Sequence, residues 1–500
     1  MMRLRALCWS WAILCVLNAK AHAHGFVLSD TPPPINTDIA DPPLVGDKDG
    51  VVYFRDKYDF IRLYPHAWLA LDAWTSAANR VTSISRETAH ADLGTRFFVR
   101  EAYLSLAGEL LQRIGFDVGL DLTSNPAIDG TRVDGTRSSV ALSNAWATLL
   151  AGRELSLTVG YFPGPYSLEN RSAPRDLSQP ERNLAVRGLI MPGNGKVLGA
   201  SARLADQWGS WRWYADLGVF GAETLAPGEF SRNFQGMGRV VVQPLATQTA
   251  SKLRNLHFGF SARYGWRVRR DTRELLSAIS TGHGFAMFRP SVRDGADELL
   301  IIPNSKHYAF GAELYVPYDK LVLRAEVHQA STRTYEASSR DWDAPIRRRG
   351  VFEGLGWYAE LSIWPLQLLL PIDGDPPLLG DFPSVQHIDM AALSPLVNRY
   401  GLELSLIVAG VNAEYAGSAR SGSAANGGAG TRAVTIYQLG AAVNYWHTAR
   451  VRFGFAYNCY WAPDSGSPDN LALSPGNLDV PPSAEAHSLH EFTARLTMGF

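Results

Sequence analysis

Cysteine is scarce in this chain of 500 residues, which has only three: Cys8, Cys15 and Cys459. Two of them lie in an N-terminal segment that we expect to be cleaved, so the exported chain keeps Cys459 alone. With one cysteine left, no intrachain disulfide can form, although the compartment reached by an exported chain would allow one.

Long apolar runs and an excess of charge are also missing. No stretch after residue 23 reaches the ~18 uninterrupted apolar residues of a membrane-spanning helix. Lys and Arg total 47 against 48 Asp and Glu, which gives a net charge of −1. Removal of residues 1–23 takes away Arg3, Arg5 and Lys20 but no acid, so the exported chain is weakly acidic. Helical membrane spans and a general attraction for nucleic acid are therefore not expected.

The N-terminus is typical of a secretory signal peptide. Arg3 and Arg5 precede a short apolar run over residues 6–17, and Ala21-His22-Ala23 fits the small-x-small cleavage pattern. We expect a signal peptide over residues 1–23. Residues 24–57 follow with five prolines (32, 33, 34, 42 and 43) and several aspartates, which predict a Pro-rich extended segment without regular pairing.

The last strand of the chain alternates between apolar and polar residues up to its final position. One face carries Phe492, Ala494, Leu496, Met498 and Phe500, and the other carries Glu491, Thr493, Arg495, Thr497 and Gly499. A terminal strand that is apolar on one side and polar on the other is typical of outer-membrane β-barrels.

The same alternation recurs along the rest of the chain. Further segments cover 61–71, 97–108, 114–122, 142–150, 155–161, 197–205, 211–220, 256–266, 308–316, 321–329, 355–363, 400–408, 437–445 and 451–461. They make about fifteen strands with the last one, and because bacterial barrels normally have an even number we predict about sixteen. The fold class is therefore all-β, a transmembrane antiparallel up-and-down β-barrel over residues 58–500 with extracellular loops.

Segments rich in Gly, Pro, Asp and Ser separate these strands and are expected to be loops. The long ones cover 125–139, 222–233, 271–297, 373–395, 416–431 and 462–487, whereas 207–210 and 317–320 fit short periplasmic turns. Eight aromatic residues near strand boundaries fit a girdle at the headgroups: Trp74, Trp146, Tyr161, Trp266, Trp364, Tyr400, Trp446 and Trp461.

Enzyme motifs are missing, and we expect neither catalysis nor a cofactor. No G-x-S-x-G, C-x-x-C, H-E-x-x-H or phosphate-binding loop occurs. His487, His490 and Glu491 are spaced like metal ligands, but on a loop that enters a strand. Cleavage after Ala23 would expose His24, and an N-terminal histidine resembles the copper site of polysaccharide monooxygenases. A secreted copper enzyme using His24 is therefore a remote alternative.

One stretch carries a resemblance to a known family. The run Gly160-Tyr161-Phe162-Pro163-Gly164-Pro165-Tyr166-Ser167-Leu168-Glu169 is followed by Arg175-Asp176 and then Glu181-Arg182. This run resembles the signature of the phosphate-selective porin O and P family, over about Asp59 to Leu217. The resemblance implies a homotrimer of sixteen-stranded barrels, inward-folded loops that narrow the pore, and passage of phosphate along lumen arginines. The chain departs from the family at Pro163, where a basic residue is common.

The polar face of each strand supplies the residues expected to line the pore. The basic ones are Arg62, Arg203, Arg212, Arg263, Arg324, Arg452 and Arg495, and the acidic ones are Asp72, Asp117, Asp121, Asp216, Glu313, Glu326, Glu360 and Glu403. Guanidinium groups along a narrow path favour anions, whereas interleaved carboxylates neutralise that field as cross-strand pairs. Arginine clusters at 267–270 and 347–349 can gather anions or hold lipopolysaccharide phosphates.

We therefore expect a porin in the outer membrane of a Gram-negative bacterium, with passive diffusion of small hydrophilic solutes, anions such as phosphate among them. The alternatives are a non-selective pore and a structural or adhesive barrel. The expected partners are outer-membrane lipid and lipopolysaccharide, further copies of the chain as a homotrimer, and no nucleic acid.

Overall fold

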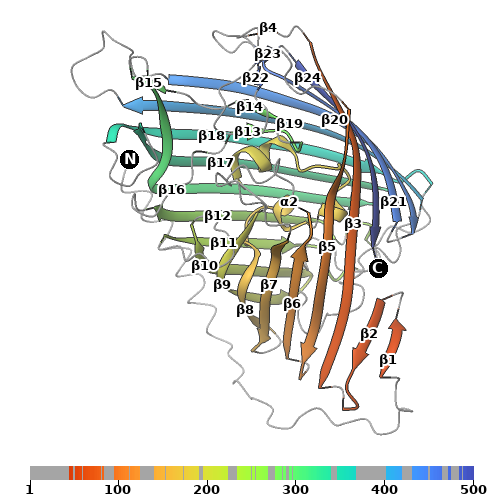
Figure 1. Ribbon diagram of the computed structural model, residues 1–500. Coiled ribbons are helices and arrows are strands. Elements are labelled where there is room, and N and C mark those ends of the chain that lie inside the picture. Colours follow the sequence, from red (N-terminus) through yellow and green to blue (C-terminus); the bar gives the residue numbers. More distant parts are fainter. Residues whose placement is uncertain are drawn as a thin grey trace. The chain divides into compact units, whose positions relative to one another are not determined.

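Figure 1 shows the computed structural model of the chain, which describes residues 44–499 with gaps. The gaps are 49–50, 59, 80–81, 84–94, 112, 124–139, 152–153, 173, 191–194, 223–232, 249–250, 254, 268–275, 277, 284, 289–291, 295–296, 339–345, 367–400, 419–430, 449–450, 464–470, 474–483 and 487. The chain divides into two units, Met1–Leu44 and Val45–Phe500, of which the second is described below. The expected signal peptide, His24 and the terminal Phe500 lie outside the described residues.

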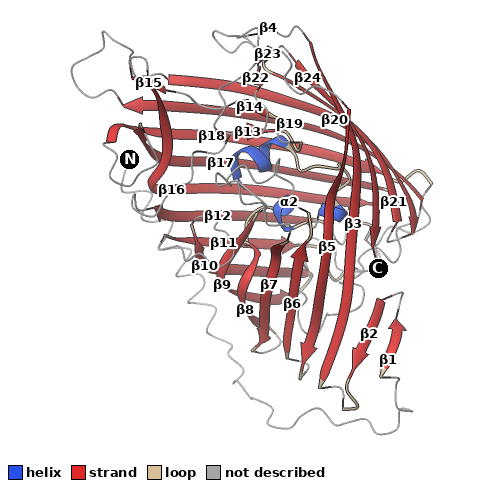
Figure 2. Cartoon of the chain, in the orientation of Figure 1, coloured by secondary structure: helices blue, strands red, loops and turns tan. Residues whose placement is uncertain are grey.

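Sixteen described strands form a closed antiparallel barrel, drawn as red arrows in Figure 2. Around the ring they are β3 (Ile61–Asn79), β5 (Thr95–Leu110), β6 (Ile114–Asp121), β7 (Ala141–Leu150), β8 (Leu155–Pro163), β9 (Lys196–Trp208), β10 (Trp211–Gly221), β11 (Phe234–Gln243), β12 (His257–Arg267), β16 (Asp297–Tyr318), β17 (Leu321–Ala337), β18 (Ile346–Ile363), β19 (Gly401–Ser418), β20 (Thr431–Thr448), β21 (Val451–Trp461) and β24 (Ser488–Gly499). β24 returns to β3, with Ser488 opposite Asn79 and Gly499 opposite Trp68. Closure gives every strand of the ring two partners for its backbone N–H and C=O groups. The predicted strand number and fold class are confirmed.

The strand that the sequence pattern missed is β11, whose sequence is FQGMGRVVVQ. Its outward positions include Gly236 and Gly238 where the other strands carry apolar side chains, and three consecutive valines follow at 240–242. Glycine weakens the strand signal, and consecutive valines hide the two-residue period. In the barrel the period is present, because Val240 is 41% exposed on the outside while Val241 is buried.

Side chains alternate between an apolar outer face and a largely polar inner face. On β24, Phe492 is 49% exposed, whereas its neighbours Glu491 and Thr493 are buried. Large exposed apolar side chains recur on the outside of other strands, such as Phe260 on β12 and Phe455 on β21. An apolar outer band is the surface that a membrane barrel presents to lipid.

The N-terminal segment differs from what we expected. Residues 24–57 were expected to lack regular pairing, but β1 (Val45–Lys48) and β2 (Val51–Arg55) form an antiparallel pair, and β2 pairs with β3 through Phe54 and Leu63. All five prolines precede Val45, so residues 45–55 keep the N–H groups that pairing needs. The barrel sheet therefore begins near residue 45 instead of 58, and residues 24–43 lie outside the described residues.

Short elements occupy several connections between the strands. Between β8 and β9 lie α2 (Leu168–Arg171), η2 (Pro174–Asp176) and η3 (Val186–Ile190), and between β12 and β16 lie β13 (Ile279–Ser280), β14 (Ala286–Phe288) and β15 (Val292–Asp294). β4 (Thr82–Ser83), β22 (Leu471–Leu473) and β23 (Ala484–Ala486) form a small separate sheet. The segments 271–297 and 462–487, expected as plain loops, thus contain short strands. No helix in the described part of the chain is long and apolar enough to cross a membrane.

Three of the expected girdle aromatics are buried instead of facing lipid. Trp74 is 3% exposed, Trp364 5% and Trp446 1%. Trp74 and Trp446 occupy inner-face positions of β3 and β20, and Trp364 stacks on Trp446 with ring centroids 6.3 Å apart. Trp266 is 48% exposed, and Tyr400 lies outside the described residues. Nearness to a strand end therefore does not show whether an aromatic side chain faces lipid or the barrel interior. The alternation along the strand decides this.

Candidate functional site: the barrel interior

The strand residues expected to line the pore occupy inner-face positions of the barrel, but their exposure differs. Buried members are Asp72, Asp216, Glu313, Glu326, Glu360, Glu403, Arg452 and Arg495, and partly exposed members are Arg62, Arg203, Arg212, Arg263, Arg324, Asp117 and Asp121. A buried side chain offers almost no surface to a passing solute. An inner-face position alone therefore does not make a residue part of a conducting path.

Several inner arginines pair with carboxylates across the barrel wall. Arg203 donates from Nε and Nη2 to the two Asp216 carboxylate oxygens at 2.9 and 2.8 Å, and Arg239 reaches Glu313 at 2.7 Å. The second pair spans β12, where Gly259 has no side chain to separate Arg239 from Glu313. Arg239 was missed because it lies on β11, the strand that the pattern did not reveal. These pairs fit the interpretation that interleaved charges neutralise one another.

Two other arginines make no ion pair with a carboxylate among the described residues. Arg263 donates from Nη1 to the carbonyl oxygen of Ile190 at 2.6 Å and lies 5.8 Å from the ring centroid of Tyr166. Arg175, in η2, lies 6.0 Å from the ring centroid of Trp68. Both guanidinium groups keep a buried Nε without a hydrogen-bond partner. Their charge is not cancelled by a bound carboxylate.

Residues 164–190 connect β8 to β9, and we name them the inner segment because they contact side chains of the inner face. Gln179 donates to the Ser405 hydroxyl at 2.9 Å, and the Leu184 N–H donates to the Gln438 side chain at 2.9 Å. Asn444 donates to the carbonyl oxygen of Ser178 at 2.7 Å. These partners lie on β19 and β20, and Figure 1 shows α2 within the ring of strands. The inner segment therefore occupies part of the barrel interior.

The residues of the family signature span the end of β8 and the start of the inner segment. Gly160 has φ 129°, and a side chain there would strike the backbone of Ala145 and Trp146, so the position requires glycine. Phe162 is fully buried and packs edge-on against Phe220 at 5.6 Å. Pro165 is buried as well. These features turn the chain off the barrel wall and fix its direction.

A carboxylate of the wall holds the first turn of α2. Glu326 on β17 accepts from the Leu168 N–H at 2.9 Å and from the Glu169 N–H at 2.8 Å. The Tyr358 hydroxyl also donates to Glu326, at 2.7 Å. The Ser167 hydroxyl accepts from the Asn170 N–H at 3.3 Å as an N-cap. The unpaired N–H groups at the start of this short helix are satisfied in this way.

Glu169, the next signature residue, belongs to α2, and its side chain is buried against residues 182–183 farther along the inner segment. It accepts from the backbone N–H of Asn183 at 2.7 Å and from the Asn183 side chain, while Arg182 donates to the carbonyl oxygens of Glu169 and Ser172. Burial raises the pKa of Glu169 to about 8, with nearby carboxylates such as Glu326 adding to the rise and Arg182 opposing it. Glu169 is thus close to titration at neutral pH.

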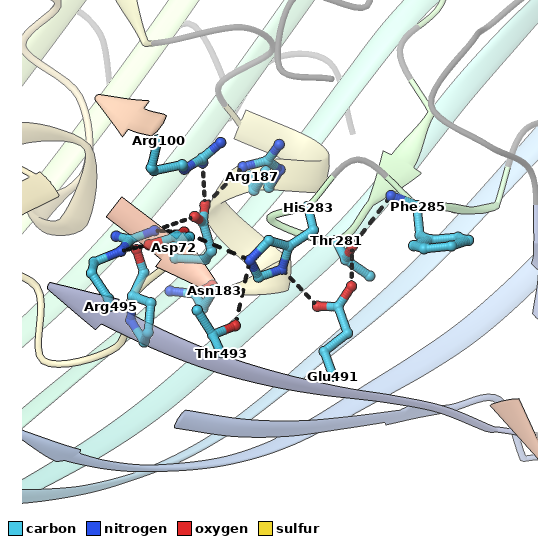
Figure 3. A network of polar contacts seen from close by, with 12 residues as sticks. Asp72, Arg100, Asn183, Arg187, Thr281, His283, Phe285, Glu491, Thr493 and Arg495 are labelled. Carbon is cyan, nitrogen blue, oxygen red and sulfur yellow. Dashed lines mark hydrogen bonds and ion pairs between the residues drawn. The ribbon is translucent and has the colours of Figure 1, made fainter. Parts of the chain in front are cut away.

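Glu181 joins the inner segment to strands of the barrel wall through ion pairs, and Figure 3 shows its partners Arg100, Arg187 and Arg495 close together. It pairs with Arg100 of β5 at 2.5 Å, with Arg495 of β24 at 2.9 Å and with Arg187 of η3 at 3.4 Å. Arg495 also binds Asp72 of β3 with two nitrogens at 2.7 Å. Burial raises the pKa of Glu181, but the surrounding arginines outweigh it and lower the pKa to about 2.

Three of the predicted pore arginines hold the inner segment through its backbone. Arg452 donates to the Leu177 carbonyl oxygen at 2.7 Å, Arg263 to that of Ile190, and Arg495 to that of Pro180. The sequence pattern placed these arginines on the correct face but could not show that their hydrogen bonds go to the chain itself. Arg100, Arg187 and Glu491 were missed as site residues, although Arg100 is buried on the inner face of β5 next to the exposed Val99.

A second connection, residues 276–288, also packs inside the barrel. Thr281 donates to Glu491 at 2.7 Å, and His283 lies 3.4 Å from the same carboxylate (Figure 3). Phe285, Phe288 and the η3 residue Leu189 pack in one apolar cluster with inner-face residues of β19 such as Ile407 and Val411. The inner face of β19 is therefore covered by apolar packing, in contrast to the polar inner face of β6.

Asp72, Glu181 and His283 each bring a possible metal-ligand atom within 4.8 Å of the others. Arg495, however, binds both oxygens of Asp72 and one of Glu181, so arginine supplies the positive charge that a cation would supply. This arrangement suits an ion-pair network better than a metal. His487 lies outside the described residues, and the ring nitrogens of His490 lie within hydrogen-bond distance of Tyr457 and Ser488.

The chain is similar to one family of known proteins and, more distantly, to several solved structures. The family model described as phosphate-selective porin O and P matches residues 83–361. Among solved structures, OmpT of Vibrio cholerae in its trimer form is 9% identical, with a TM-score of 0.48 over 88% of this chain and 100% of that chain. An anion-selective porin from Comamonas acidovorans is 11% identical, with a TM-score of 0.44 over 88% of this chain and 100% of that chain. No curated protein matches the chain.

A closed barrel with an apolar exterior and a charged interior defines this protein as a porin of the Gram-negative outer membrane. The chain belongs to the phosphate-selective porin O and P family. The resemblance drawn from the run Gly160–Glu169 is confirmed, and the family match extends to residue 361, well beyond Leu217.

Proposed function

We propose that this porin passes small hydrophilic solutes by passive diffusion and that small anions, phosphate among them, are the preferred class. No cofactor takes part, and the chain acts as a channel and not as an enzyme. Solute moves down its own gradient through a water-filled interior whose width is limited by the inner segment.

The proposed anion preference rests on Arg263 and Arg175, whose positive charges are not paired with a carboxylate of the described residues. Both side chains are only partly buried. A guanidinium group whose charge is not cancelled attracts anions and can bind a phosphate with two parallel hydrogen bonds. Membership of a family described as phosphate-selective supports the same solute class.

A non-selective pore is the second candidate, and the paired charges favour it. Arg203 with Asp216, and Arg239 with Glu313, contribute little net field to the interior. Carboxylates such as Glu360 and Glu403 add negative charge to the same face. A structural or adhesive barrel is a third candidate, which requires that the protein conducts little.

Planar-bilayer recording of the purified protein separates these candidates. Stepwise conductance supports a porin, and its absence favours the structural or adhesive barrel. In a salt gradient, a reversal potential set by the anion supports the proposed preference, and one near zero supports the non-selective pore. We expect Arg263→Gln to shift the reversal potential toward cations. Arg333→Gln removes the same charge from the exposed outer side of β17 and should leave it unchanged.

We further propose that the barrel assembles as a homotrimer and contacts outer-membrane lipid and lipopolysaccharide. The trimer is the expectation carried by the family, and the exposed apolar outer face supports contact with lipid. Sedimentation or mass photometry in detergent reports the number of copies. Mass spectrometry of the purified protein reports whether lipopolysaccharide remains bound.

A further inference from the structure

We infer that Glu181 is a positioning residue that sets the cross-section of the pore by holding the inner segment against the seam where the barrel closes. This inference rests on the proposed function, since it concerns the width of the conducting path. It adds a specific role for one carboxylate and for the arginines around it.

The Glu181 side chain connects three parts of the chain. Glu181 comes from the inner segment, Arg100 from β5 and Arg495 from β24, and the pairs measure 2.5 and 2.9 Å. Arg495 also ties the segment by its backbone, through a hydrogen bond to the Pro180 carbonyl oxygen. Because β24 and β3 are the strands that close the ring, the segment is fixed to the closure itself (Figure 3).

Removal of the Glu181 charge is expected to have a larger effect than the loss of a single hydrogen bond. Arg100, Arg187 and Arg495 all converge on Glu181, and their side chains are no more than 16% exposed. Without the negative charge, these three cations would repel one another in a poorly hydrated site. Moving the inner segment away from the wall admits water and relieves that repulsion. Loss of the Glu181 charge should therefore displace the segment and widen the path.

The seam should survive this change. Asp72 still binds Arg495 with two hydrogen bonds, and β24 keeps its backbone ladder with β3 from Ser488 to Gly499. His283, near Asp72 and Glu491, stacks on Trp74 at 4.8 Å independently of Glu181. The position of the segment and the closure of the barrel are thus separable by mutation at Glu181.

The test compares Glu181→Gln with Glu181→Asp and with Glu353→Gln, which changes an exposed carboxylate on the outside of β18. Ser178→Cys, at a position that is 1% exposed, reports the position of the segment in a Cys459→Ser background. We expect Glu181→Gln to raise single-channel conductance and open-channel noise, and to speed labelling of the cysteine by about 10- to 100-fold. Glu181→Asp should restore much of the original behaviour, and Glu353→Gln should match the parent protein.

Two readouts keep the outcomes distinct. If a folded Glu181→Gln protein shows unchanged labelling and unchanged conductance, Glu181 does not position the segment. If all the proteins fail to conduct while labelling still speeds up, the pore proposal is lost and the anchoring of the segment stands. The folded state of each variant is checked by the shift between unheated and heated samples on a gel.

Discussion

The two ends of the inner segment are anchored by opposite arrangements of charge. Near the N-terminal end, Glu169 lies among Glu326 and Glu360 with Arg182 as the opposing cation. Near the C-terminal end, Glu181 lies among three arginines. Both carboxylates belong to the family signature, with Glu169 buried and the Glu181 side chain 9% exposed, yet the pKa is about 8 for Glu169 and about 2 for Glu181. Neighbouring charges, and not burial alone, decide the protonation state of each.

This difference indicates two kinds of attachment. The Glu181 end is an ion-pair network that persists over a wide pH range, because its carboxylate stays ionised far below neutrality. The Glu169 end depends mainly on hydrogen bonds that α2 makes with Glu326 of the barrel wall and with Asn183 farther along the segment. The Glu169 carboxyl group titrates near pH 8. We therefore expect the contacts of Glu169 to weaken as the pH rises through about 8, while the ion pairs of Glu181 persist.

The largest effect is expected from Arg495→Gln, which breaks the stronger anchor. Asp72 would lose its bidentate partner and Glu181 one of its three cations. Leaving a buried charge without its partner costs about 3–5 kcal/mol. The thermal midpoint of the folded gel band should fall sharply. Recovery of part of the loss in the double variant Asp72→Asn/Arg495→Gln would confirm the coupling, and strictly additive losses would contradict it.

A smaller and local effect is expected from Glu326→Gln at the other anchor. The amide can accept one N–H of α2 but presents a donor to the second, so one buried N–H of Leu168 or Glu169 loses its acceptor. Such a loss costs about 1–3 kcal/mol. Hydrogen exchange of residues 168–172 should speed up while residues 177–187 stay protected. Equal acceleration of both stretches would show that the two ends are not independent.

The overall fold could be predicted because a membrane barrel repeats one local rule. Each strand shows its outer face to lipid and its inner face to polar groups, so the two-residue period appears in the sequence of each strand by itself. Among the sixteen strands of the ring the period failed only at β11, where Gly236 and Gly238 leave two outer positions without side chains. Trp74 and Trp446 obey the period and point inward, and the girdle expectation was wrong for them because it used their nearness to a strand end instead.

The site could be predicted only in part, because its contacts join residues far apart in the chain. The strand pattern gave Arg495 and the family resemblance gave Glu181, but neither placed the two beside each other, and 314 positions separate them. The pairing of Arg239 with Glu313 across β12 depends on a glycine that leaves room between two strands. Such contacts follow from the register of the closed ring, which the sequence pattern does not contain.

The pH dependence of stability separates the two anchors directly. The folded chain holds a proton on Glu169 between its ordinary pKa of 4.5 and about 8, where the unfolded chain releases it. Stability contributed by this group is therefore full below pH 4.5 and is lost as pH rises through about 8. The thermal midpoint should fall between pH 4.5 and about 8 in the parent protein and level off above that. Glu169→Gln, which keeps the neutral form, should remove that slope, and an unchanged slope would assign the titration to another group.

The smallest expected effect is at the N-cap of α2, where two substitutions separate capping from backbone strain. Ser167 has φ 67°, in the left-handed region that favours glycine, and its hydroxyl accepts from the Asn170 N–H. Ser167→Ala loses the cap and keeps the strained backbone, which should cost about 1 kcal/mol. Ser167→Gly loses the cap but relieves the strain, so it should cost only a few tenths of that. Thermal midpoints that rank alanine below glycine support this account, and the reverse order would show that the chain leaves β8 without strain at this residue.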